Sequence, residues 1–138
     1  EYPGKLHVEL KYDEFLAHRI EAGVDFFLMP SHFEPSGLSQ LYSLAYGSVP
    51  IVRKTGGLAD TVVDTTRANL NKDIATGIVF EPPTAEALVG AVRRACTLFQ
   101  DKQTYHKVQT TGMREDFSWE RAAKAYINVY RQAVQKMR

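Results

Sequence analysis

The sequence lacks the features that several large classes of protein require. A single cysteine, Cys96, stands among 138 residues, so an internal disulfide and a zinc ribbon are both excluded. Lys and Arg number 17 against 16 Asp and Glu, and a formal charge of +1 offers no basic excess for binding nucleic acid. Apolar runs such as residues 24–30 are too short to span a bilayer, and the first residues show no signal-peptide pattern. We therefore expect neither nucleic acid nor a membrane as a partner.

Short motifs that identify several kinds of active site are also missing. There is no G-x-G-x-x-G and no Walker loop, which argues against dinucleotide and P-loop sites. No D-x-D pair offers the carboxylate clamp by which many sugar transferases hold a metal, and there is no G-x-S-x-G elbow. The histidines do not have metal-ligand spacing. We therefore predict no metal site and no cofactor.

What the sequence does contain is a regular alternation of strand and helix patterns. With 44% hydrophobic and 24% charged residues, the composition is that of one ordinary globular domain and excludes disorder. Strands alternating with helices favour an α/β fold with a Rossmann-like parallel sheet, right-handed crossovers and C-terminal helices. The predicted strands are 6–10, 25–29, 49–52 and 77–80, and the predicted helices are 13–23, 37–46, 58–62, 84–99, 102–114 and 118–137.

Three local features complete this prediction. The dense apolar run at residues 25–29 is typical of a parallel strand buried on both faces. The polar stretch at residues 65–74 is predicted to be an exposed loop. Cys96 lies on the apolar side of a predicted helix, so we expect a core residue there and not a reactive thiol.

Two loops at the carboxyl ends of predicted strands are the candidate binding elements, because ligands of open parallel sheets bind there. In residues 30–38, the N–H groups of Ser36, Gly37 and Leu38 would point out of a helix N-terminus toward hydroxyl or phosphate oxygens. Glu34 can accept hydrogen bonds from vicinal sugar hydroxyls. The competing interpretation is that Glu34 only lies near the helix dipole while Gly37 makes a tight turn.

The second loop, residues 53–58, reads Arg-Lys-Thr-Gly-Gly-Leu. Its cations and backbone amides can contact a phosphate group. A plain strand-to-helix turn with solvated cations explains the same residues, so this string alone is weak support for a site.

Taken together, residues 30–63 resemble the donor-binding lobe of bacterial glycogen synthases and plant starch synthases, which are retaining glycosyltransferases of the two-Rossmann-domain GT-B type. The string F-E-P-S-G-L-S-Q-L-Y at residues 33–42 is similar to the family's F-E-P-[CS]-G-L-x-Q-x-x, and residues 46–62 match its next segment nearly throughout. Parts of residues 12–25 and the D-F-S-W string at residues 116–119 also fit, so the resemblance covers essentially the whole chain.

The resemblance implies roles for individual residues. Glu34 would be the active-site carboxylate that holds the donor-glucose hydroxyls. Ser36, Gly37 and Leu38 would form the backbone cradle for the sugar and the diphosphate. Tyr12 resembles the tyrosine that stacks on adenine.

In the second loop, Thr55, Gly56 and Gly57 would close the donor pocket. Residues 54–58 imitate the family's N-terminal K-x-G-G-L loop, but they follow the Glu34 helix and so correspond to a C-terminal look-alike. Many related transferases carry E-x7-E, whose second Glu binds ribose, and here Tyr42 holds that position. Tyr42, counted among the donor-binding residues, favours the starch and glycogen synthase branch over the UDP-sugar branch.

The parent reaction that the resemblance implies is transfer of glucose from ADP-glucose to the non-reducing end of an α-1,4-glucan, with retention. The chain opens Glu-Tyr-Pro-Gly without an initiator Met, and we interpret residues 1–138 as a C-terminal lobe cut from a longer protein. The family's acceptor-binding N-terminal domain and its phosphate-binding Arg and Lys would then precede this chain. We expect the isolated chain to be inactive, because a diphosphate leaving group needs that positive charge. Bacterial cytoplasm or plastid is the expected location, and secretion is not.

Several alternatives stay open at the level of sequence. One is a UDP-sugar transferase lobe of the same fold. Others are a non-catalytic flavodoxin-like or receiver-type module, which the lack of an acidic cluster disfavours, and a glucan-binding or regulatory chain. The last helix, whose two apolar edges carry Trp119, Tyr126 and Tyr130 on one side and Ile127 and Val134 on the other, packs either against the family's N-terminal domain or on its own lobe.

Overall fold

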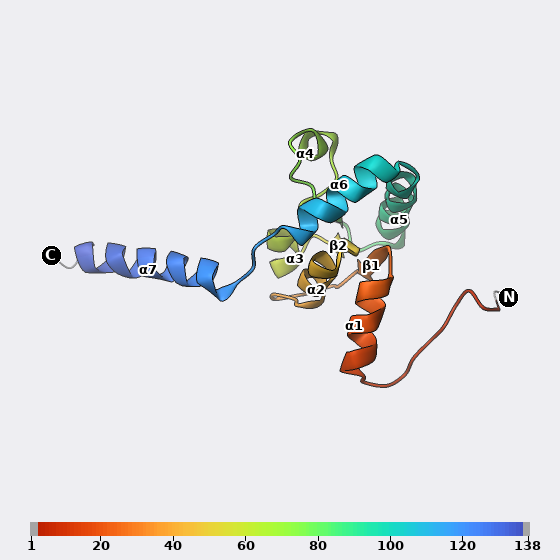
Figure 1. Cartoon of the computed structure of the whole chain (residues 1–138), viewed down its shortest axis with the longest axis horizontal. Helices are drawn as coiled ribbons and strands as arrows, with labels where there is room; N and C mark the ends of the chain where they lie inside the picture. The colour runs from red at the N-terminus through yellow and green to blue at the C-terminus, as the bar shows by residue number, and fades with distance from the viewer. Residues whose placement is uncertain (1–2, 137–138) are drawn as a thin grey trace.

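A computed structural model describes residues 3–136, so residues 1 and 2 of the opening string and the end of the last predicted helix at residue 137 lie outside it. Seven helices and three strands are found among the described residues (Figure 1). In chain order they are α1 (Glu14–Gly23), β1 (Phe26–Met29), α2 (Ser39–Tyr46), β2 (Val49–Arg53), α3 (Gly56–Thr61), α4 (Arg67–Asn71), β3 (Ile78–Phe80), α5 (Ala85–Gln100), α6 (Lys102–Met113) and α7 (Trp119–Lys136).

The three strands form one parallel sheet in the order β1-β2-β3. Successive strand residues point to opposite faces, so the core has two parts. On one face, Ile51 and Ile78 pack with buried residues of α5 and α6. On the other face, Val52 packs with Leu58 of α3 and with Val62. The predicted parallel α/β sheet is therefore confirmed.

Several predicted helix ends are confirmed by their capping contacts. The Asp13 carboxylate accepts a hydrogen bond from the Leu16 N–H at 2.9 Å, which satisfies one free donor at the start of α1. Thr84 caps α5 in the same way through the N–H of Ala87. Gly47 ends α2 with a φ of 85°, a left-handed conformation that glycine adopts without strain.

The strand predicted at residues 6–10 is wrong. This segment is extended but belongs to no ladder of the described sheet, and Leu6 and Leu10 are 78% and 93% exposed. A strand needs a neighbour that satisfies its N–H and C=O groups, and an alternating sequence does not provide one. Burial of residues 25–29 on both faces is likewise wrong: β1 pairs only with β2 within the described sheet, and Leu28 is exposed.

Two further predictions about single segments are corrected. Residues 65–74 are not all loop, because they contain α4, whose N-cap Thr66 accepts a hydrogen bond from the N–H of Asn69. Cys96 is exposed and not a core residue. The buried face of α5 is carried by Ala91, Ala95 and Leu98, which turns position 96 toward solvent.

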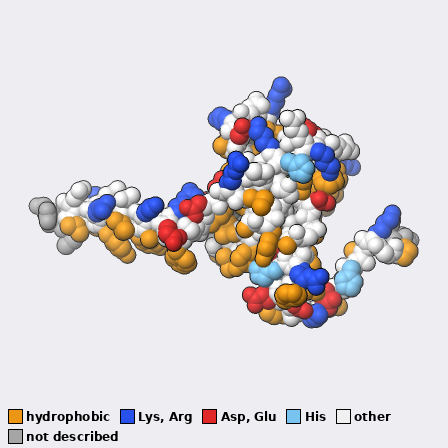
Figure 2. All heavy atoms as spheres, viewed as in Figure 1, with side chains coloured by type: hydrophobic (Ala, Val, Ile, Leu, Met, Phe, Trp, Pro, Cys, Tyr) orange, Lys and Arg blue, Asp and Glu red, His pale blue; other side chains and the backbone are white. Residues whose placement is uncertain are grey.

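Helix α7 projects away from the rest of the molecule (Figure 1), and none of its described residues is buried. The alternative in which it packs on its own lobe is therefore wrong for this structure. Apolar side chains gather along one side of this helix (Figure 2). Trp119 and Tyr130 of this helix are largely exposed. In the described part of the chain, no helix combines the length and the apolar character that crossing a membrane requires.

Candidate functional site

Two loops at the carboxyl ends of adjacent strands form the candidate site. Loop A is defined as residues 30–38, which follow β1, and loop B as residues 53–58, which run from the end of β2 into α3. Because β1 and β2 are parallel neighbours, both loops leave the same edge of the sheet. The N–H of Gly57 lies 3.2 Å from the carbonyl oxygens of Glu34 and of Pro35. The two predicted binding loops are thus in direct contact through their backbones.

This contact explains the glycine pair of loop B. A Cβ atom at position 56 would lie 2.9 Å from the carbonyl carbon of Glu34 and closer still to its oxygen. A Cβ atom at position 57 would lie 2.5 Å from the Cα of Ser36. Gly56 also has a φ of 43°, which side-chain-bearing residues rarely adopt. Both positions therefore require glycine if the loops are to approach this closely.

Gln40 on α2 connects the two loops from inside the protein. Its side chain is fully buried, and its Nε2 donates to the carbonyl oxygens of Ser36 and Gly37, each at 3.0 Å. The same nitrogen contacts the hydroxyl of Thr61 at 3.2 Å, and that hydroxyl donates to the carbonyl of Gly57 at 2.6 Å. We did not single out Gln40 from the sequence, although it lies within the F-E-P-S-G-L-S-Q string, three residues after Gly37.

Both cations of loop B are occupied by other partners. The Nε of Arg53 donates to the carbonyl of Ser31 at 2.7 Å, and its guanidinium also contacts the carbonyl of His32, which holds the start of loop A. The Nζ of Lys54 lies 2.6 Å from Glu81. This hydrogen bond, and the attraction of opposite charges, raise the pKa of Lys54 and lower the pKa of Glu81. In this structure both cations thus have partners within the protein.

A cavity of about 270 Å³ lies beside the loops. Residues that follow or end all three strands contribute to it, so it sits at the carboxyl edge of the sheet, where a ligand of such a fold binds. The lining consists of Pro30, His32, Arg53, Phe80, Pro83, Thr84, Ala85 and Leu88.

The other predicted features of the site are the start of α2, Tyr42 and Tyr12. Helix α2 begins at Ser39, later than predicted, because Gly37 has a φ of 75° and cannot be part of the helix. The ring of Tyr42 packs edge-on against His18 of α1, with ring centroids 5.0 Å apart. Tyr12 stands before the N-cap of α1 and is 92% exposed. The loops therefore bring together the predicted residues at 34–37 and 55–57, while Tyr12 is left in solvent.

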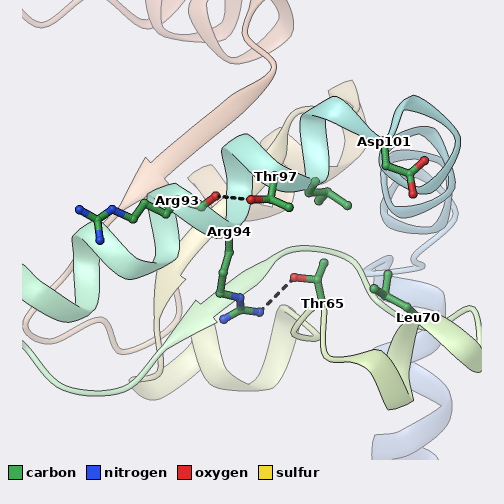
Figure 3. Close-up of a pocket in the computed structure, with 7 residues that line it drawn as sticks. Thr65, Leu70, Arg93, Arg94, Thr97 and Asp101 are labelled. Carbon is green, nitrogen blue, oxygen red and sulfur yellow. Dashed lines mark hydrogen bonds between the residues drawn. The ribbon is translucent and has the colours of Figure 1, made fainter.

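A second cavity, of about 420 Å³, lies between the C-terminal half of α5 and the segment around α4 (Figure 3). Helix α5 follows β3 and packs back along it, so this half of the helix is remote from the carboxyl edge of the sheet. Its lining residues are Thr65, Leu70, Arg93, Arg94, Thr97, Leu98 and Asp101.

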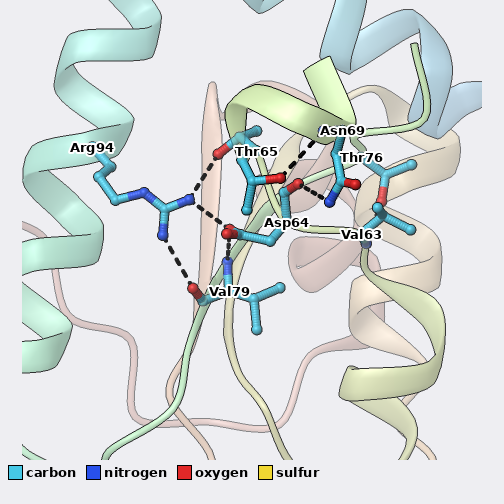
Figure 4. Close-up of polar contacts among 8 residues, drawn as sticks. Val63, Asp64, Thr65, Asn69, Thr76, Val79 and Arg94 are labelled. Atoms are coloured by element: carbon cyan, nitrogen blue, oxygen red, sulfur yellow. Dashed lines mark hydrogen bonds and ion pairs between the residues drawn. The ribbon is translucent and has the colours of Figure 1, made fainter. Parts of the chain in front are cut away.

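Arg94, which lines this second cavity, is engaged within the protein (Figure 4). The guanidinium of Arg94 contacts the Asp64 carboxylate at 2.6 Å, the Thr65 hydroxyl at 3.1 Å and the Val79 carbonyl at 3.2 Å. The Asp64 carboxylate also accepts from the Val79 N–H at 2.7 Å. These contacts anchor the segment before α4 to β3 and α5, and we assign them a structural role. Within residues 3–136, no cluster of three or more His, Cys, Asp or Glu side chains is arranged to hold a metal ion.

Comparison with known sequences identifies relatives along nearly the whole chain. The family described as "Glycosyl transferases group 1" matches residues 9–112. Glycogen synthase 2 of Nitrosococcus oceani is 49% identical over 133 residues, and the glycogen synthase of Hydrogenovibrio crunogenus is 53% identical over 134. These matches cover 96% and 97% of this chain but 27% of each relative, so the chain spans about a quarter of their length.

Solved structures agree with these matches. The catalytic domain of starch synthase IV from Arabidopsis thaliana, bound to ADP and acarbose, superposes with a TM-score of 0.79 at 38% identity, covering 91% of this chain and 26% of that one. Sucrose-phosphate synthase from Thermosynechococcus elongatus superposes with a TM-score of 0.59 at 26% identity, covering 85% and 27%. The expected Rossmann-like architecture of a GT-B catalytic domain is thereby confirmed.

Proposed function

The chain belongs to the group 1 glycosyl transferases, and from this premise we propose that residues 1–138 are the C-terminal, donor-binding lobe of a glycogen or starch synthase. The proposed reaction transfers glucose from ADP-glucose to the non-reducing end of an α-1,4-glucan, with retention. The observation that carries the proposal is the backbone contact between loops A and B at the carboxyl edge of the sheet, where two glycines leave no room for a side chain. The glycogen synthase relatives and the ADP-bound starch synthase support it.

In this proposal each loop has a separate task. The Glu34 carboxylate accepts hydrogen bonds from the vicinal hydroxyls of the donor glucose. Its backbone carbonyl accepts from Gly57, so the position of this residue is set by loop B and does not depend on its side chain. The N–H groups of Gly37 and Leu38 bind diphosphate oxygens, and Thr55, the N-cap residue of α3, contributes to the donor site from loop B.

We further propose that the 138 residues alone do not transfer glucose. A departing diphosphate must be stabilised by positive charge in the transition state. In loop B, Arg53 is hydrogen-bonded to loop A and Lys54 is paired with Glu81, so both cations are already engaged within the protein. Further parts of a longer enzyme would bind the acceptor glucan and supply the remaining cations. The apolar side of α7 would pack against such a part.

The family match excludes the receiver-type module that the sequence left open. The family match does not decide which nucleotide the donor carries. ADP is our proposal, because Tyr42 places a phenol ring where related enzymes carry a carboxylate for ribose, and because the starch synthase neighbour was solved with ADP. A UDP-sugar donor is the alternative.

The proposal is tested by following the backbone amide shifts of this chain as ADP, UDP and ADP-glucose are added. We expect shifts at residues 36–38 and 55–57, at lower concentrations of ADP than of UDP. Responses to UDP at lower concentrations than to ADP would favour the UDP-sugar alternative. A well-dispersed spectrum that responds to none of the three would contradict donor binding by this lobe, and a response to a maltooligosaccharide alone would favour a glucan-binding role.

Replacing Tyr12 with Ala is expected to weaken ADP binding without destabilising the fold. Stacking of a base on an aromatic ring contributes about 1–3 kcal/mol, so the Kd for ADP should rise between about fivefold and a hundredfold. Because Tyr12 is 92% exposed, its loss should change the free energy of unfolding by less than about 0.5 kcal/mol. The matched control is Tyr126→Ala, an exposed tyrosine on α7, which should leave ADP affinity unaltered. Equal ADP affinities for both variants and the unaltered chain would remove the stacking role.

A further inference from the structure

We propose that Gln40 is a positioning residue that turns the N–H groups of Gly37 and Leu38 toward the donor diphosphate. The inference rests on the proposed function, since it assigns the buried amide to the same donor cradle. The observation behind it is a fully buried glutamine whose Nε2 faces two consecutive backbone carbonyls of loop A, those of Ser36 and Gly37.

Because the peptide group is planar, the direction of each of these two carbonyls fixes the direction of the N–H group of the next residue. In a trans peptide, the C=O of one residue and the N–H of the next point in opposite directions, and no cis peptide occurs among the described residues. The Ser36 carbonyl points toward the buried amide, so the N–H of Gly37 points away from it. The same holds for the Gly37 carbonyl and the N–H of Leu38. Two successive N–H groups that point away from the buried amide can together form a concave site for an anion.

The amide of Gln40 also ties this arrangement to loop B. Its Nε2 reaches the Thr61 hydroxyl, which donates to the Gly57 carbonyl, while the Gly57 N–H returns to the carbonyl of Glu34. The result is a closed chain of hydrogen bonds from loop A through α2 and α3 to loop B. One side chain therefore orients the peptides of loop A and also connects loop A to the α3 hydroxyl that contacts loop B.

The other end of the amide accounts for the glycine at position 37. The Oε1 of Gln40 is buried and has no hydrogen-bond partner among the described residues. A Cβ atom at position 37 would lie 2.9 Å from the Gln40 Nε2 and closer still to Oε1, so the amide occupies the space a side chain would need. A buried acceptor without a partner costs stability, and such costs are concentrated at functional sites. The contacts of the amide within the described residues are thus made by its nitrogen, to the two loop A carbonyls and to the Thr61 hydroxyl.

The test compares Gln40→Met with Gln109→Met in this chain. Gln109 is the matched control, because its Nε2 also donates to a backbone carbonyl, that of Gly47, but at the opposite end of α2. The probes are ADP and inorganic pyrophosphate, with affinities measured by calorimetry and the melting temperature of each variant measured alongside. Losing the aligned donors should raise the Kd for both ligands about tenfold in Gln40→Met. The Gln109→Met variant should keep affinities within about twofold even where its melting temperature falls.

A measurement on the free chain tests the positioning role without any ligand. Scalar couplings across hydrogen bonds, from Gln40 Nε2 to the carbonyl carbons of Ser36 and Gly37, should be detectable in the free chain, and their absence would overturn the positioning role. ADP and pyrophosphate affinities that survive Gln40→Met would overturn this inference alone. Failure of the unaltered chain to bind either ligand would overturn the proposed function, and the inference with it.

Discussion

Replacing Gly57 with Ala is expected to force loops A and B apart and to weaken donor binding about a hundredfold. The added Cβ atom would lie 2.5 Å from the Cα and 2.6 Å from the carbonyl carbon of Ser36. These are backbone atoms, so no side-chain rotation relieves the overlap, and the hydrogen bonds from Gly57 to Glu34 and Pro35 must lengthen or break. A displacement of about 1 Å in a binding site costs about a hundredfold, which sets the expected rise in the Kd for ADP.

The same substitution should lower the free energy of unfolding by about 2–4 kcal/mol, a magnitude typical of overpacking at a rigid contact. Gly90→Ala is the matched control. It makes the same chemical change in the middle of α5, where a Cβ atom meets nothing within 4 Å. Gly90→Ala should stabilise the chain by about 0.4–1 kcal/mol, because it restricts the unfolded state, and should leave ADP binding unchanged. Normal ADP affinity in Gly57→Ala would show that close contact of the loops is not required for the site.

Replacing Glu34 with Gln should reduce transferase activity about a hundredfold to a thousandfold in a longer enzyme that carries this chain. The substitution keeps the size of the side chain and removes the negative charge that we assign to holding the donor-glucose hydroxyls. Stability should change little, because the contact of Glu34 with loop B is made by its backbone carbonyl, which the substitution leaves in place. The measurement is kcat/KM for ADP-glucose, with melting temperatures recorded for each variant.

Glu86→Gln provides the control for this experiment, since Glu86 is an exposed carboxylate in the first turn of α5. It should lose less than about twofold in activity. Wild-type activity in Glu34→Gln would remove the hydroxyl-holding role. Binding of ADP itself should be nearly unaffected in Glu34→Gln, because ADP lacks the glucose. A large loss of ADP affinity would place Glu34 at the nucleotide instead.

The sequence by itself determined the features that depend on neighbours a few residues away. Asp13 and Thr84 cap helices through hydrogen bonds that span three residues, and Gly47 ends a helix through its own backbone conformation. The alternation of strand and helix was sufficient to predict the parallel sheet. The strings at residues 33–42 and 46–62 were sufficient to predict the family that the sequence match then showed.

Only the tertiary structure decided which segments have partners. Residues 6–10 carry a strand pattern without a strand, because pairing depends on a second segment and not on alternation. The resemblance assigned Gly56 and Gly57 to the pocket, but the reason for glycine is the Glu34 and Ser36 backbone, which lies about twenty residues earlier in the chain. Gln40 was missed because its role is visible only once Thr61 of α3 stands beside it. Contacts between distant residues set the shape of this site, and local sequence patterns do not encode them.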